Sequence, residues 1–466
     1  MDFFSFKFLA FLSLTLLLFH LKPTRGLRKW LLFAASLLFY VFLSKWCVIY
    51  LAITTVVVYL CALKNTKASC LLGIILTLFS LVFFKYTPFL YNTFANFTGM
   101  PSWSLKWLVP LGISFYTFRL ISYLTDVRRG ETQAESDPFY FFTYAAFFPL
   151  VICGPIQRAG DFLPALREPN ELTPDRFDRG ARQILWGLVK KAVVADNLAV
   201  LVNSVFSGCE SKSGFVFVLA VFLYSLQIYC DFSGYSDMAI GVSRLFGIDL
   251  KANFRVPYVS ATIKEFWSRW HISLSLWFRD YVYFPMGGGR CGKLRRSFNI
   301  MVAFLLSGLW HGANWTFIVW GALHGAGLII EKLLFPTKEE SPNKAAKFIW
   351  AAFTAFLVLF GWLFFRSESI RQAVYIMQNA FVGSCSPLAY LREGFLSLMG
   401  EEAGIINILR ISVPAVIVFV AEYFYRNRDP WTSSERKAPV LFYIATLILI
   451  FLCKAGEPQE LIYGQF

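Results

Sequence analysis

The chain has 466 residues, of which 57% are apolar and 16% are charged. Soluble domains carry about 25% charged residues, so this composition excludes an ordinary soluble protein and indicates a membrane protein. The formal net charge is +15, but the basic residues cluster in short loops between apolar runs, which indicates membrane orientation rather than nucleic-acid binding. The nine cysteines include no CxxC pair, which argues against a disulfide framework and a zinc site.

Five apolar segments of nearly membrane-spanning length open the chain, at 3–20, 30–44, 46–63, 69–86 and 106–124. Basic residues occupy the first, third and fifth connections: Lys22, Arg25, Arg28, Lys29, Lys64, Lys67, Arg128 and Arg129. The positive-inside rule then predicts that the N-terminus lies outside and that these connections lie in the cytoplasm. Because the first segment lacks a basic start and a small-residue cleavage pattern, we expect a retained span rather than a signal peptide.

The pattern becomes less regular after Phe139. The segment 158–183 is rich in proline and charge, and we expect it at the cytoplasmic interface. The segment 229–257 mixes charged residues with glycines and aromatics, which predicts a re-entrant or interior segment. Further spans are predicted at 182–206, 214–230, 346–365, 370–382, 409–425 and 438–453. The predicted fold class is therefore an all-α polytopic membrane protein with about eleven spans plus re-entrant or interfacial helices.

Three of the four histidines lie in one apolar, aromatic stretch, at His271, His311 and His324. An ionisable side chain at membrane depth is energetically expensive, so it marks a candidate functional site. Histidine is also suited to moving a proton near neutral pH. The fourth, His20, ends the first span, and we expect it at the level of the lipid headgroups.

His311 lies in GLWHGANW, where helical spacing predicts that it shares a face with Asn314, Trp315 and Ile318. Glycines on either side would allow another helix to approach closely. A histidine at such a crossing can simply bridge two helices by hydrogen bonds. The surrounding aromatic residues and the second nearby histidine favour a functional role.

His324 is thirteen residues further on, which in a continuous helix places it about 220° around and about 20 Å along the axis from His311. We therefore expect a packing or supporting role for His324. His271 lies in an amphipathic run in which Trp267, Trp270 and Leu274 share its face. This run predicts a helix lying in the membrane interface, where His271 is either a surface anchor or a partner for His311.

Asp231 and Asp237 are carboxylates in otherwise apolar sequence. They can mark proton or ion transport. Alternatively, they can pair with arginines such as Arg244 or Arg269 and form part of the interior wall. We find no internal repeats of the kind expected in secondary transporters, so the wall interpretation is favoured.

Several long motifs resemble the membrane-bound O-acyltransferase family: FWSRWHISLSLWFRDYVYFPMGGG, GLWHGANWTFIVWGALHG, GPIQRAGDFLP and YCDFSGYSDMAIGVSRLFGIDLKANFRVPY. The similarity covers at least residues 150–330 and is greatest to the bacterial branch that contains the alginate O-acetyltransferase membrane subunit. The ending LIYGQF is similar to the aromatic Ile-Tyr-Phe-Gln-Phe ending of polysaccharide-acetylating members, although Gly464 departs from it.

The resemblance implies a ring of helices around a central funnel, with the acyl donor entering from the cytoplasm. It implies one membrane acyltransferase domain over 1–466. In it, N-terminal spans (1–137) precede a catalytic core (138–335) and C-terminal spans (336–466). The location implied is the bacterial cytoplasmic (inner) membrane.

By the same resemblance, His311 matches the catalytic histidine, and His271 occupies a second motif position where many eukaryotic relatives carry asparagine. We expect substrate or tunnel contacts from nearby polar and aromatic residues: Trp267, Arg269, Trp270, Trp310, Asn314, Trp315, Asp231, Tyr235 and Asp237. Acyl transfer from a thioester to an alcohol needs a base and a hydrogen-bond donor for the oxyanion. His271, Asn314 or an indole N–H can be that donor. No Gly-x-Ser-x-Gly elbow or histidine pair at metal-ligand spacing is found, so direct transfer assisted by His311 is the simplest mechanism, with an acyl-histidine intermediate as the alternative.

Three functions remain open from the sequence. The first is transfer of acetyl groups from acetyl-CoA, as co-substrate rather than bound cofactor, to an exported polysaccharide, directly or through a periplasmic SGNH-type partner. The second is D-alanyl transfer to teichoic acid, and the third is a proton-coupled transporter. The His311 motif disfavours the third. Basic residues between the two histidine motifs can attract donor phosphates or simply fix the topology: Arg290, Arg295 and Arg296.

Overall fold

The computed structural model describes residues 5–103, 107–334, 344–399, 405–425, 440–456 and 459–462. Within these ranges every regular element is helical, which confirms the predicted all-α class. Gly464, where the ending LIYGQF departs from the aromatic pattern of the family, lies outside the described residues.

The α-helices follow one another along the chain with short connections. In order they are α1 Phe6–His20, α2 Arg28–Leu43, α3 Lys45–Lys64, α4 Lys67–Thr98, α5 Ile113–Arg129, α6 Pro138–Ala146, α7 Ala159–Arg167, α8 Pro174–Leu188, α9 Asp196–Ser207, α10 Phe215–Leu245, α11 Ile263–Arg269, α12 Ile272–Phe278, α13 Lys293–His311, α14 Trp315–Leu334, α15 Lys344–Arg366, α16 Ile370–Asn379, α17 Pro387–Met399, α18 Ile405–Tyr425 and α19 Val440–Cys453. Two π-helical segments continue α8 and α12, at Val189–Ala195 and Arg279–Tyr283.

Six helices in the described ranges are long and apolar enough to cross a membrane: Lys22–Leu43, Lys45–Lys64, Lys67–Thr98, Phe215–Leu245, Trp315–Leu334 and Lys347–Arg366. Five of them coincide with predicted spans, and the sixth lies in the histidine-containing stretch. The predicted spans at 106–124, 182–206 and 370–382 fall instead on α5, on α8 with α9, and on α16. These helices are shorter or carry buried charges, so they are not simple apolar spans.

The boundaries of α4 and α5 differ from the predicted 69–86 and 106–124 because glycines set them. α4 continues through the uncharged segment after Tyr86 and ends at Gly99, which has a φ of 73°. α5 starts after Gly112, whose φ is 72°, and a Cβ there would lie 2.0 Å from the carbonyl oxygen of Val151. Only glycine fits this close approach in the left-handed conformation.

The segment 229–257 was expected to be re-entrant or interior, and its contacts fit the interior alternative. α10 runs without interruption to Leu245, and its polar residues Asp231 and Ser233 are buried. Its glycines permit close helix packing. A Cβ on Gly234 would lie 2.8 Å from the carbonyl oxygen of Gly187 in α8. The helix therefore avoids lipid through contacts with protein rather than by breaking.

The chain divides into two compact units, each built from separate stretches of sequence. The first contains the described residues of Met1–Ile184 and Ser236–Ala252. The second contains those of Leu185–Tyr235, Asn253–Ser433 and Ala438–Phe466. The division into 1–137, 138–335 and 336–466 remains a prediction.

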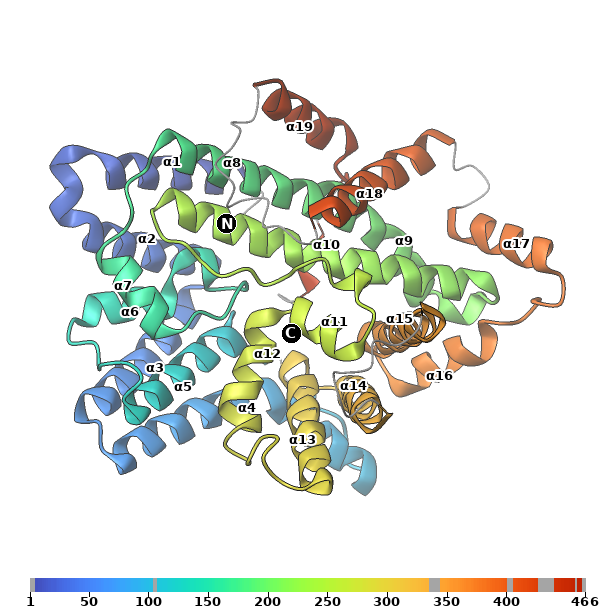
Figure 1. Ribbon diagram of the computed structural model, residues 1–466, viewed down its shortest axis with the longest axis horizontal. Coiled ribbons are helices and arrows are strands. Elements are labelled where there is room, and N and C mark those ends of the chain that lie inside the picture. Colours follow the sequence, from blue (N-terminus) through green and yellow to red (C-terminus); the bar gives the residue numbers. More distant parts are fainter. Residues whose placement is uncertain are drawn as a thin grey trace. The chain divides into compact units, whose positions relative to one another are not determined.

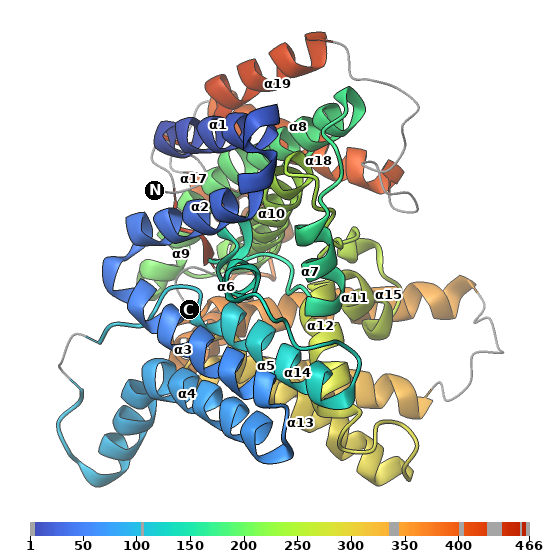
Figure 2. The same ribbon diagram turned by 90° about the vertical axis from the view of Figure 1, so that its left-hand side faces the viewer.

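In the first unit, α3, α4 and α5 lie alongside one another (Figure 2). Phenylalanines from α1 and α2 meet Phe148 in a cluster with ring centroids 5.4–6.5 Å apart, formed by Phe8, Phe11 and Phe39. All three histidines of the candidate site belong to the second unit, so the candidate site lies within that unit.

Candidate active site

α13 and α14 form a tight hairpin that places His311 at its turn (Figure 1). A Cβ on Gly308 would lie 2.2 Å from the carbonyl oxygen of Phe317. One on Gly321 would lie 2.4 Å from the carbonyl oxygen of Phe304. Glycine at both positions therefore lets the two backbones approach closely. Of the glycines that flank His311, Gly308 makes the predicted close approach, whereas Gly312 faces the Phe317 ring.

The turn itself uses Asn314. Its Oδ1 accepts a hydrogen bond of 3.1 Å from the N–H of Thr316, and its Nδ2 donates one of 2.8 Å to the carbonyl oxygen of Glu368. Asn314 thus begins α14 and ties the turn to the end of α15. Trp315 is 49% exposed. The predicted helical face shared by His311, Asn314 and Trp315 does not form, because the helix ends at His311.

His311 is 2% exposed and is enclosed by aromatic rings. Its ring centroid lies 5.0 Å from those of Trp310 and Trp320 and 5.2 Å from that of Phe365. The ring of His271 lies 6.2 Å away. The structure therefore brings together the two histidines that the sequence proposed as partners.

His324 is nearer to this cluster than expected, because the chain reverses between the two histidines instead of continuing as one helix. The Trp320 ring lies 5.0 Å from both His311 and His324. His324 is fully buried, its ring stacks on Phe266 at 6.2 Å and 6°, and it meets the Trp267 ring at 5.1 Å. Neither ring nitrogen has a hydrogen-bond partner among the described residues. These contacts fit the predicted packing role.

His271 lies at a break between α11 and α12. The amphipathic run was expected to form one interfacial helix, but His271 has φ 41° and ψ 54°, the left-handed conformation that ends a helix. Its ring is fully buried, and its Nδ1 lies 3.2 Å from Oδ1 of Asn253. Burial lowers the pKa of His271, which is outside the six candidate spans, to about 3. The imidazole is therefore neutral at physiological pH.

α11 carries the two tryptophans of the motif inward. Trp267 and Trp270 are both buried, and Trp270 packs on Trp362 at 4.8 Å. The N-terminus of α11 is fixed by Glu331, whose Oε2 accepts hydrogen bonds from the N–H groups of Ile263 (2.6 Å) and its neighbour. Sequence reasoning missed Glu331, although an acidic residue near the end of a span is a signal for such a cap.

Other predicted site residues serve structural contacts. Arg269 donates to Glu265 at 3.0 Å and to the carbonyl oxygen of Arg255 at 3.2 Å. Tyr235 is buried in α10.

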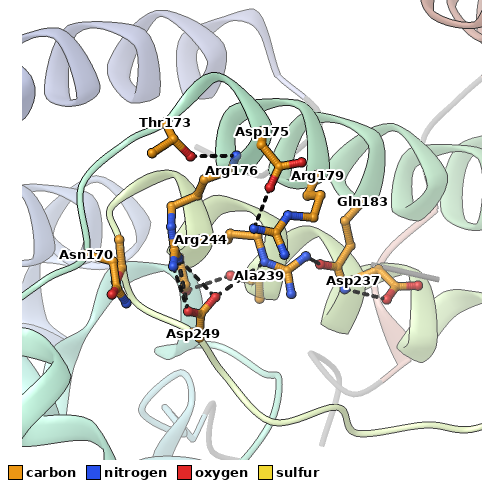
Figure 3. Close-up of polar contacts among 12 residues, drawn as sticks. Asn170, Thr173, Asp175, Arg176, Arg179, Gln183, Asp237, Ala239, Arg244 and Asp249 are labelled. Atoms are coloured by element: carbon orange, nitrogen blue, oxygen red, sulfur yellow. Dashed lines mark hydrogen bonds and ion pairs between the residues drawn. The ribbon is translucent and has the colours of Figure 1, made fainter. Parts of the chain in front are cut away.

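Asp237 belongs to the first compact unit, where Gln183 donates to it at 3.2 Å (Figure 3). Gln183 also accepts from Arg244 at 2.9 Å, and Asp249 binds Arg176 through paired contacts of 3.0 Å. Gln183 thus bridges Arg244 and Asp237.

Asp231 is not paired with the predicted arginines. It lies 2.6 Å from Nζ of Lys191, which also contacts Asp196 at 2.8 Å. The N–H of Ile462 donates to Asp231 at 2.8 Å, and Lys191 donates to the carbonyl oxygen of Gln459 at 2.9 Å. The wall interpretation of Asp231 fits these contacts, but the cation is Lys191, which sequence reasoning missed.

The basic segment before α13 is at the surface. Arg290 and Arg295 are exposed and Arg296 is half-buried. Asn299 holds the preceding glycine-rich loop by donating to the carbonyl oxygen of Met286 at 3.1 Å. Within the described ranges, no group of three or more His, Cys, Asp or Glu side chains is close enough to hold a metal ion.

These features define a polytopic helical membrane protein with a buried, aromatic-walled histidine cluster. Residues 130–370 match the model of the membrane-bound O-acyltransferase family. The chain belongs to this family and is a membrane O-acyltransferase.

Individual relatives cover most of the chain. A probable alginate O-acetylase of Pseudomonas syringae pv. tomato is 38% identical over 92% of this chain and 83% of the relative. A peptidoglycan O-acetyltransferase of Helicobacter pylori is 33% identical over 81% of this chain and 78% of the relative. A teichoic acid D-alanyltransferase of Streptococcus thermophilus is 31% identical over 51% of this chain and 60% of the relative.

Proposed function

We propose that this protein moves acetyl groups from cytoplasmic acetyl-CoA across the membrane for O-acetylation of an exported polysaccharide. The observation that carries the proposal is the buried pair of His311 and His271, 6.2 Å apart within aromatic rings. The similarity to an alginate O-acetylase and a peptidoglycan O-acetyltransferase supports acetyl as the group and a glycan as the acceptor.

His311 acts as the general base. The acceptor hydroxyl oxygen attacks the thioester carbonyl carbon while His311 takes the hydroxyl proton. The C–S bond then breaks, and the proton passes from His311 to the leaving thiolate. Indole N–H groups of Trp267, Trp270 and Trp320 are buried without a hydrogen-bond partner among the described residues, so they are candidates for the oxyanion donor.

The N-terminus lies outside, in the bacterial cytoplasmic membrane, and the loop with Arg290, Arg295 and Arg296 faces the cytoplasm. The exposed cations there attract the phosphates of coenzyme A, which enters as a co-substrate. The acetyl group leaves on the other side, onto the polysaccharide or onto a periplasmic SGNH-type transferase.

Reconstituted vesicles with labelled acetyl-CoA test the base. His311→Ala should reduce acetyl transfer by about 10²- to 10⁴-fold without loss of folded protein, because the proton acceptor is removed. His20→Ala is the matched control. His20 lies in the first unit, with its Nε2 2.8 Å from the carbonyl oxygen of Leu245. Near-normal turnover of folded His311→Ala would refute the assignment.

D-alanyl transfer to teichoic acid is the second candidate, and it is favoured by the 31% identity to a teichoic acid D-alanyltransferase. Transfer from a D-alanyl carrier protein but not from acetyl-CoA in the same vesicles would decide for it. Membership of an acyltransferase family argues against the proton-coupled transporter.

A further inference from the structure

The segment that follows α10 is fastened to the break between α11 and α12. The carbonyl oxygen of Asn253 accepts the N–H of Ile272 at 2.9 Å, and the N–H of Arg255 donates to the carbonyl oxygen of Arg269 at 2.9 Å. These two backbone bonds flank His271 on either side. Asn253 itself is 1% exposed, so its amide group is enclosed with the histidine ring.

The hydrogen bonds of Asn253 define its orientation. Its Oδ1 receives the backbone N–H of Ser273 at 3.3 Å and the hydroxyl of Ser273 at 2.9 Å. A backbone N–H can only donate, so the side-chain atom that it meets must be the oxygen. The same oxygen lies 3.2 Å from Nδ1 of His271. That nitrogen must therefore carry the proton and donate it.

We propose that Asn253 is a positioning residue that holds neutral His271 as its Nδ1–H tautomer, so that Nε2 carries the lone pair within the histidine cluster. In the proposed acyl transfer, on which this role rests, Nε2 accepts a hydrogen bond from a second hydroxyl of the acceptor glycan. This contact orients the reacting hydroxyl, whose own proton goes to His311, toward the thioester. A neutral His271 in this tautomer cannot donate to the oxyanion from Nε2. That task passes to another donor.

The surroundings of His271 keep the ring neutral and fixed. Its ring faces Phe232 of α10 at 4.7 Å, Phe254 at 6.3 Å and Trp310 of α13 at 5.8 Å. The ring of His311 in α13, a titratable group, lies 6.2 Å from that of His271. The left-handed backbone of His271, with a φ of 41°, is unfavourable for a non-glycine residue, so surrounding contacts must maintain it.

The tautomer can be measured without any assay of activity. The chain has four histidines, so ¹⁵N-histidine labelling gives few signals, and the His271→Ala spectrum identifies the one that belongs to His271. We expect the Nδ1–H form in the wild type and a shift toward the Nε2–H form in Asn253→Leu. Ser273→Ala, the matched control, removes one donor to the same oxygen and should keep the Nδ1–H form. An Nε2–H signal in the wild type, or an unchanged signal in Asn253→Leu, would overturn the proposal even if the proposed substrate is correct.

The pH dependence of turnover provides the second test. In Asn253→Asp the carboxylate still accepts Nδ1–H but also favours the imidazolium, so the pKa of His271 rises. As the pH is lowered toward 5, turnover of this variant should therefore decline at a higher pH than turnover of the wild type. Asn253→Leu should lower kcat by about tenfold or more while KM for the donor changes little. A purely structural Asn253 would leave the shape of the profile unchanged, and that result would contradict the positioning role.

Discussion

Lys191 is predicted to be a stability-critical cation of the second unit. Its ammonium lies 2.6 Å from Asp231, 2.8 Å from Asp196 and 2.9 Å from the carbonyl oxygen of Gln459. The side chains of Lys191, Asp231 and Asp196 are 1%, 2% and 5% exposed. Lys191→Met would leave two carboxylates buried without this cation.

Removing one partner of a buried ion pair destabilises a protein by about 3–5 kcal/mol, because the remaining charge is no longer compensated. For a unit of this size, that loss lowers Tm by roughly 5–15 °C. Thermal unfolding of the purified protein in detergent, followed by intrinsic tryptophan fluorescence, measures the change. Lys251→Met is the matched control. Lys251 pairs with Asp161, but their side chains are 72% and 52% exposed, so its removal should change stability by less than about 1 kcal/mol.

A double variant separates the charge from the packing of the lysine stem. Lys191→Met combined with Asp231→Asn removes one of the two buried carboxylates left without the lysine cation. The amide oxygen of the new Asn side chain can still accept the N–H of Ile462. It should recover about 1–3 kcal/mol relative to Lys191→Met. If Lys191→Met lowers Tm no more than Lys251→Met does, the buried ion network is not the stabilising element inferred here.

Three further changes test the site. His324→Ala removes a ring packed between Phe266, Trp267 and Trp320, so the free energy of unfolding should fall by about 3–5 kcal/mol. Turnover per folded molecule should fall much less than in His311→Ala. An equal loss of turnover in folded protein would instead show that His324 takes part in the chemistry. Glu331→Ala leaves two N–H groups at the start of α11 without their acceptor, so it should lower the free energy of unfolding by about 1–3 kcal/mol. The same unfolding assay measures this change, and Glu331→Gln should give an intermediate value. Neutralising Arg290, Arg295 and Arg296 together should raise KM for the donor, more so at low salt, with kcat little changed; an unchanged KM would leave these arginines a purely topological role.

The sequence was informative wherever a single physical requirement decides the structure. Apolar length predicted the helices α2, α3 and α10 because a bilayer span needs about 20 such residues. Helix ends were predicted less well. The span predicted at 69–86 was expected to end at Tyr86, yet α4 continues until Gly99, where the left-handed conformation ends it.

The sequence predicted which histidines form the candidate site, but it did not predict the backbone geometry around them. His271 and His311 were paired because buried histidines are expensive, and the structure brings their rings together. The helical faces predicted around His271 and around His311 were both wrong. The prediction assumed unbroken helices, whereas the chain turns at Gly312–Asn314 and breaks at the left-handed His271. A non-glycine residue rarely adopts that conformation, so local sequence gives no warning of it.

The pairing of buried charges is the clearest case in which local sequence is not sufficient to predict the structure. The cost of burying Asp231 requires a partner, but that requirement does not say which residue supplies it. Arg244 was a reasonable choice by proximity in sequence, yet it bonds to Gln183. The partner, Lys191, lies forty positions earlier in the π-helix Val189–Ala195. There the adjacent Lys190 and Lys191 are both buried and reach different acids, Glu422 for the first and Asp231 for the second. The acid partners come from α18 and α10, so only the folded unit determines which lysine each carboxylate receives.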